Sequence, residues 1–166
     1  LLIYYAGHGY LDRTTQTGFW QPIDAEMYDD LNWIANEDLT RRINAMTANH
    51  VMVIADSCYS GTLVRAAETE LPTGGEHDAW LRRMVEKRSR TAMVSGGLEP
   101  VSDAGTDEHS VFAYAFLTAL EENAIALDGQ SLFHIISRPV IVNAEQTPQY
   151  SDIRRAGHEA GEFIFV

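Results

Sequence analysis

The sequence has a single cysteine, Cys58, among 166 residues. One thiol excludes an internal disulfide and a metal cluster held by several cysteines, because each of these needs more than one. Sparse cysteine is typical of proteins in a reducing compartment, and we expect a cytoplasmic protein. A lone cysteine has to be judged by the residues around it.

Long apolar segments are also absent. The longest purely apolar runs, such as Val51 to Ala55 and Pro139 to Val142, fall far short of the ~20 residues that a membrane-spanning helix needs. The first residues lack the basic and then apolar pattern of a signal peptide. Because the sequence opens on Leu1 inside an apolar run, we expect a piece of a longer protein whose upstream strands lie outside it.

Basic residues are scarce: 12 Lys and Arg stand against 24 Asp and Glu, which makes the net charge −12. Nucleic acids and anionic membranes attract basic surfaces, so neither is expected as a partner. A positively charged substrate fits this charge better, although acidic surfaces also serve solubility alone. The length, the 45% hydrophobic content and the lack of repeats are typical of one globular domain.

Short apolar runs alternate with helical patterns along the chain. Strands are predicted at 1–6, 51–55, 91–95 and 162–166, the first two of them buried. Helices are predicted from Asn36, an N-cap candidate, to Met46, over 78–90, from Ser110 as N-cap to Glu122, and over 132–142, where Pro139 should break or kink the helix. The residues from 10 to 35 are predicted as loop with a short hairpin. This alternation indicates an α/β domain with a mostly parallel sheet covered on both faces.

Two chemically useful side chains follow predicted strands. His8 stands between Gly7 and Gly9 after the first strand, and Cys58 lies in a turn of small residues after the second. A thiol attacks only as a thiolate, so a catalytic cysteine needs a nearby base and an exposed position. Neighbouring parallel strands are ~4.8 Å apart, which brings side chains at their carboxyl ends within working range. An isolated cysteine is more often a small core residue, and His8 is what favours a nucleophile here.

The segments YAGHG at 5–9 and ADSCYSG at 55–61 resemble the paired motifs of the caspase-like cysteine peptidases, in their metacaspase and bacterial branch. Caspases carry the catalytic His about 50 residues before the Cys, and here the separation is 58 − 8 = 50. Further similarity lies at 95–100 (SGGLEP), 110–112 (SVF), 146–150 (QTPQY) and 163–165 (FIF). The resemblance covers nearly the whole chain and implies a three-layer α/β/α fold with a mostly parallel central sheet.

The resemblance also implies roles for residues. His8 takes the thiol proton, Cys58 attacks the scissile carbonyl to form a thioester, and the backbone N–H groups of Gly9 and Cys58 stabilise the oxyanion, each worth ~3 kcal/mol. A large-subunit-like part is expected at 1–66, a linker and basic helix at 67–90, and a small-subunit-like part at 91–166. The remaining histidines are expected at the surface or in packing roles: His50, His77, His109, His134 and His158.

Substrate preference is predicted from Asp56, two residues before the nucleophile. Aspartate-cutting caspases resemble Gln-Ala-Cys there, whereas this chain reads Asp-Ser-Cys. A carboxylate attracts a Lys or Arg side chain and repels an Asp, so protein or peptide substrates with basic residues are expected. Glu99 and Asp103, after the third strand, are either further walls of the same pocket or solvated loop acids.

Calcium activation occurs in some metacaspases through a cluster of aspartates. Asp24, Glu37 and Asp38 sit in roughly comparable places, but Arg65 stands where another acid would be expected. Charges in a first helical turn and a loop acid account for these residues equally well, so no metal site and no cofactor is predicted.

Self-processing is a further expectation, because family members are often cut between the piece that bears the His and Cys and the piece that follows. Basic residues that would suit such a cut are Arg65, Arg82, Arg83, Lys87, Arg88 and Arg90. Two other classes remain open. One is a catalytically silent caspase-like scaffold, and the other is a different α/β hydrolase, which Ser57 and Ser60 disfavour because they lack a Gly-x-Ser-x-Gly elbow. We expect an active endopeptidase that is a monomer or a loose assembly.

Overall fold

The apolar runs predicted as strands form the centre of the computed structural model, which describes residues 1–64, 77–97 and 109–166. Four strands pair in the order β1-β5-β6-β8, with β1, β5 and β6 parallel and β8 antiparallel to β6. Their bounds are β1 Leu2–Ala6, β5 His50–Asp56, β6 Ser89–Val94 and β8 Gln149–Asp152. The predicted α/β class with a mostly parallel sheet is confirmed.

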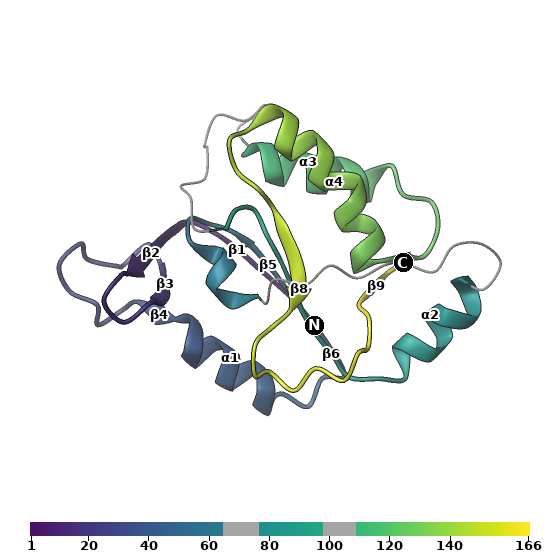
Figure 1. Ribbon diagram of the computed structural model, residues 1–166, viewed down its shortest axis with the longest axis horizontal. Helices are drawn as coiled ribbons and strands as arrows, with labels where there is room; N and C mark the ends of the chain where they lie inside the picture. Colours follow the sequence, from purple (N-terminus) through teal and green to yellow (C-terminus); the bar gives the residue numbers. More distant parts are fainter. Residues whose placement is uncertain (65–76, 98–108) are drawn as a thin grey trace.

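Helices cover both faces of this sheet, which gives three layers (Figure 1). Helix α1 (Asn36–Ala45) packs its Leu39 and Ile43 against one face, where Val51 and Val53 of β5 point. The alternate β5 side chains, such as Met52, lie in the second core with α3 (Val111–Glu121) and α4 (Gly129–Asn143). Because successive strand residues point to opposite faces, a strand covered on both faces is apolar throughout. Residues 51 to 55 are indeed fully buried.

Strand β1 departs from the prediction of a buried strand. Within the described residues it pairs only with β5, and Leu2 and Tyr4 are 42% and 47% exposed. Tyr4 lies beside Phe116 of α3, with ring centroids 6.4 Å apart. Apolar composition alone does not distinguish an edge strand from a central one, because burial depends on which neighbours the sheet places beside it.

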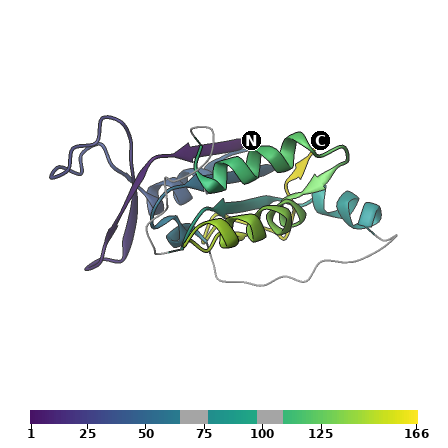
Figure 2. The same cartoon turned by 90° about the horizontal axis from the view of Figure 1, so that it is seen from above.

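The segment predicted as loop with a short hairpin forms a second, antiparallel sheet. It contains β2 (His8–Asp12), β3 (Thr17–Gln21) and β4 (Ile34–Ala35). This sheet projects beyond one end of the central sheet (Figure 2). The rings of Tyr10, Phe19 and Trp33 pack together in it, with centroids 4.9 Å apart for Tyr10 and Trp33 and 5.7 Å for Phe19 and Trp33. His8 therefore begins a strand rather than ending a turn.

The carboxyl-terminal strand lies elsewhere than predicted. β9 (Ile164–Phe165) pairs with β7 (Leu127–Asp128) in a separate two-stranded sheet, and β8 takes the fourth place in the central sheet. α2 (His77–Val85) ends five residues before the predicted end, because Ser89 and Arg90 belong to β6.

The structure tests the two predicted N-caps and the effect of Pro139. The N-cap of α1 is Ala35, and the Asn36 amide instead donates to the Thr62 hydroxyl in η1 (Ser60–Leu63). Ser110 caps α3 as predicted, since its Oγ accepts from the Ala113 N–H at 2.9 Å. Helix α4 continues past Pro139 to Asn143, so of the break or kink expected there the break does not occur.

Arg90 is a buried cation held by backbone carbonyls. Its side chain is fully buried in β6. The guanidinium donates to carbonyl oxygens at the end of α1 and in the connection to β5, namely those of Ile43, Met46, Ala48 and Asn49, and to that of Ser89, at 2.7–3.2 Å. Carbonyls at a helix C-terminus attract cations, so Arg90 ties α1 to the sheet.

A second buried polar group lies near the carboxyl terminus. The Glu162 carboxylate accepts hydrogen bonds from the Tyr150 hydroxyl and from the Phe163 N–H. Burial raises the pKa of Glu162 to about 7, and the negative charge of Asp128 adds to the rise, although the bonds from Tyr150 and Phe163 oppose it. Glu162 therefore holds its proton over a pH range in which the unfolded chain has lost it.

We predict that this group makes the folded protein less stable as pH rises. The pKa of Glu162 is higher in the folded chain than in the unfolded chain, so the proton that Glu162 holds stabilises the folded state. This stabilisation is fully present below pH 4.5 and is lost as pH rises to about 7. The free energy of unfolding should fall by about 3 kcal/mol over that window, and Glu162→Gln should remove most of this slope. Urea unfolding between pH 4.5 and 7.5 measures it, with exposed Glu121→Gln as the control. An unchanged slope in Glu162→Gln would contradict the assignment.

Candidate active site

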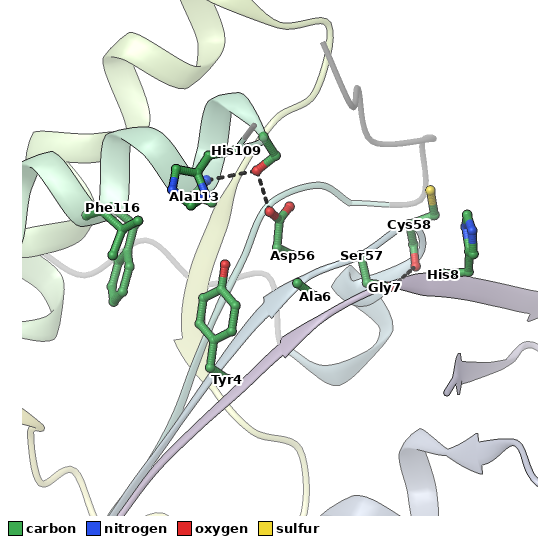
Figure 3. Close-up of a pocket in the computed structure, with 12 residues that line it drawn as sticks. Tyr4, Ala6, Gly7, His8, Asp56, Ser57, Cys58, His109, Ala113 and Phe116 are labelled. Carbon is green, nitrogen blue, oxygen red and sulfur yellow. Dashed lines mark hydrogen bonds between the residues drawn. The ribbon is translucent and has the colours of Figure 1, made fainter. Parts of the chain in front are cut away.

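The pairing of β1 with β5 places His8 beside Cys58. Ala6 is the register partner of Asp56, and the Gly7 N–H donates to the Asp56 carbonyl at 3.3 Å. His8 and Cys58 each stand two residues beyond that pair. Both residues line one cavity, and the imidazole and the thiol point to the same side of the sheet edge (Figure 3). His8 is exposed and Cys58 is partly exposed, so both are accessible to a substrate.

Gly9 is in close contact with the cysteine turn. A Cβ added at Gly9 would lie 2.0 Å from the Cys58 carbonyl oxygen and 2.6 Å from the Ser57 Oγ. No side chain fits there, so glycine is what allows β2 to start directly against Cys58. Gly9 was predicted from the motif, and the structure brings it together with His8 and Cys58.

Tyr5 holds the bend between β1 and β2. Its hydroxyl donates to the His8 carbonyl at 2.7 Å and to the Gln21 carbonyl at 3.0 Å. Its ring stacks on Trp20, with centroids 4.3 Å apart and planes 3° from parallel. Burial raises the pKa of Tyr5, which keeps this hydroxyl a donor. Sequence reasoning missed this residue, because the bond to Gln21 spans 16 residues.

The turn that carries Cys58 is fixed by hydroxyl groups. Ser60 donates to the Ser57 carbonyl at 2.7 Å and to the Gly96 carbonyl at 3.2 Å. The Ser57 N–H donates to the Ser95 hydroxyl at 3.2 Å. These bonds attach the turn to the residues that follow β6. Ser57 and Ser60 are buried and bonded in this way.

A cavity of about 620 Å³ lies beside Cys58 on the α3 side of the sheet. Asp56 is 8% exposed in its wall, where the Ser110 hydroxyl donates to its carboxylate. The other lining residues include Tyr4, Ala6, His109, Ala113, Phe116 and Leu117. Burial, with a contribution from the charge of Asp56, raises the pKa of Tyr4, so that its hydroxyl stays neutral. The cavity therefore combines apolar walls with one carboxylate next to the thiol.

The remaining predicted pocket acids and the other histidines do not all lie at this cavity. Glu99 and Asp103 lie outside the described residues. His109, expected to be a surface residue, is exposed but lines the cavity. His50 and His158 contact backbone groups of Lys87 and Arg90 away from it.

The acids considered for calcium do not form a cluster. Asp24 lies in an exposed loop, and Asp38 forms an exposed ion pair with Arg41 at 2.7 Å. In the described ranges no group of three or more His, Cys, Asp or Glu side chains is arranged to hold a metal ion. Over the same residues no helix is long and apolar enough to cross a membrane.

Chemically, the site offers a thiol beside an imidazole at the mouth of a cavity with an acidic wall. The sequence model of one known family, described as the caspase domain, matches residues 1–156 of this chain. No curated protein matches the chain.

The contact at Gly9 yields a prediction about thiol reactivity. Gly9→Ala should separate His8 from Cys58, and alkylation of Cys58 by iodoacetamide should slow about tenfold, because the thiolate depends on a neighbouring base. His8→Ala should slow it to a similar extent.

The control is Gly157→Ala, far along the chain at a backbone φ of +76°. It should lower stability, because a side chain is strained there, and leave the alkylation rate unchanged. Alkylation of folded Gly9→Ala at the wild-type rate would contradict the role given to this contact.

Proposed function

The chain belongs to the caspase-domain family of cysteine peptidases, and we propose that it hydrolyses peptide bonds after a basic residue with Cys58 as nucleophile and His8 as base. The register of β1 with β5 carries the proposal: it pairs Ala6 with Asp56, so that His8 and Cys58 follow at equal distance along the chain, and both residues line the same cavity. The same register puts the Asp56 carboxylate in the wall of the adjoining cavity.

The reaction follows from these positions. His8 accepts the thiol proton, and the Cys58 thiolate attacks the carbonyl carbon of the scissile bond. The oxyanion is stabilised by the N–H groups of Gly9 and Cys58. The intermediate collapses to a thioester as His8 returns the proton to the leaving amine. Water, deprotonated by His8, then attacks the thioester, releases the acid and restores the thiol.

The cavity supports a preference for Arg or Lys before the scissile bond. Its apolar walls suit the methylene stem of a long cation, and the Asp56 carboxylate suits the charged head. An Asp side chain would meet a like charge there. Glu99 and Asp103 are proposed as further acids of this pocket.

Cleavage of two fluorogenic peptides, one ending in Arg and one in Asp, tests the function. The Arg peptide should be cleaved, the Asp peptide should not, and Cys58→Ala should abolish cleavage, with calcium or with a chelator present. Asp56→Asn should lower kcat/KM for the Arg peptide about 100-fold, since a charge-assisted bond is worth about 3 kcal/mol. Glu121→Gln, which removes one exposed negative charge, is the matched control.

Cleavage of neither peptide would favour the alternative of a silent scaffold. Equal cleavage of both, lost in Cys58→Ala, would keep the peptidase and overturn the role of Asp56.

Self-processing in the linker is proposed as well, with the division at 66 and 91 expected from the family. Peptidases bind extended segments, whereas Arg82 and Arg83 lie in α2 and Arg90 lies buried in β6. The carbonyls of Lys87 and Arg88 are hydrogen-bonded to His50 and Glu159. Arg65, which lies outside the described residues, is the cleavage position that we propose. On prolonged incubation, mass spectrometry should show a cut after Arg65 in the wild type and intact chain in Cys58→Ala and in Arg65→Ala. A wild-type chain that stays intact with and without calcium would count against it.

A further inference from the structure

A second cavity, of about 720 Å³, lies next to His8 and shares the wall of Ala6, Gly7 and His8 with the first. Its remaining lining comes from the end of β3 and the loop that follows: Gln21, Pro22, Ile23, Ala25 and Met27, with Tyr5 of β1. Cys58 and Asp56 line only the first cavity, so His8 stands between two spaces of different composition.

The proposed chemistry indicates which side of the scissile bond lies next to each cavity. The residue before the scissile bond stays attached to Cys58 in the thioester, so its side chain belongs with the cavity that Cys58 and Asp56 line. The amine on the other side of the bond takes its proton from His8. The peptide that begins with this amine therefore leaves past His8, on the side of the second cavity.

We infer that the second cavity receives the side chain of the residue directly after the scissile bond, and that Ile23 and Met27 select an apolar residue there. The inference rests on the proposed function and adds a second specificity determinant to it. The occupant is a substrate segment, because the cavity is continuous with the proposed catalytic pair through His8.

The composition of the second cavity supports this choice. Among the described residues that line it there is no Asp, Glu, Lys or Arg. Ile23 is fully exposed and Met27 is 77% exposed. A substrate side chain in the cavity removes apolar surface of both residues from water, which favours Leu or Met. A Lys or Arg side chain there would lose water without an Asp or Glu of the described lining to pair with.

Hydrogen bonds hold the loop that supplies Ile23 and Met27. The Ala25 N–H donates to the Pro22 carbonyl at 2.9 Å, and the Trp33 indole donates to the Glu26 carbonyl at 3.0 Å. Tyr5, whose ring stacks on Trp20, is also part of the lining. The cavity is therefore formed before a substrate binds, as is usual for ligand pockets.

Two internally quenched peptides that differ only after the scissile Arg, one with Leu and one with Ser, test the inference. The wild type should show a kcat/KM about tenfold higher for Arg-Leu than for Arg-Ser. The double variant Ile23→Ser with Met27→Ser should bring this ratio close to 1. The ratio is measured on one preparation, so a partly unfolded variant lowers both rates and leaves the ratio intact.

Leu31→Ser provides the matched control, because Leu31 is 82% exposed in the same loop and does not line the cavity. It should keep the wild-type ratio. A wild-type ratio near 1, or a ratio unchanged in the double variant, would overturn the inference.

Labelling of the wild type with an arginyl chloromethyl ketone separates the two levels of failure, because this reagent has no residue after the reacting carbon. Labelling of Cys58 together with equal cleavage of both peptides would leave the proposed function standing and remove only the second determinant. If the reagent does not label Cys58 and neither peptide is cleaved, both the proposed function and the second determinant are overturned.

Discussion

The in-register pairing of β1 with β5 is the constraint on which the site depends. Because Ala6 pairs with Asp56, His8 and Cys58 follow the two strands at the same distance from a common register pair. The bare backbone of Gly9 then lets β2 begin against the cysteine turn. A slip of one residue would turn the side chains of β1 to the opposite face and break both relations.

Side-chain hydrogen bonds around this pairing hold the residues of the site in place. Tyr5 fixes the carbonyl of His8, Ser60 attaches the cysteine turn to the end of β6, and Ser110 joins the Asp56 carboxylate to the start of α3. These contacts link the carboxyl ends of three neighbouring segments of the sheet to one helix. Reacting groups that are positioned before a substrate arrives lower the entropic cost of the reaction.

Two cavities of different composition flank His8: one has the Asp56 carboxylate in its wall, and the described lining of the other holds no Asp, Glu, Lys or Arg. In the proposed function this asymmetry gives a bound peptide a direction, with a basic residue on the Cys58 side and an apolar residue on the far side. A net charge of −12 suits cationic peptides in general. The walls of the two cavities are the proposed source of any finer selection.

The sequence alone predicts the α/β class, strands β5 and β6, the Ser110 cap, and His8 and Cys58 as catalytic candidates. All of these predictions depend on short-range patterns and on residues at strand ends. The family resemblance added the predictions for Gly9 and Asp56. Only the folded chain shows that β1 is half exposed, that β8 rather than β9 completes the central sheet, and that Ser110 bonds Asp56 across 54 residues. The reason is physical: a hydrophobic pattern reports local periodicity, whereas burial, strand partners and hydrogen bonds between distant residues are set by which segments the whole chain brings together.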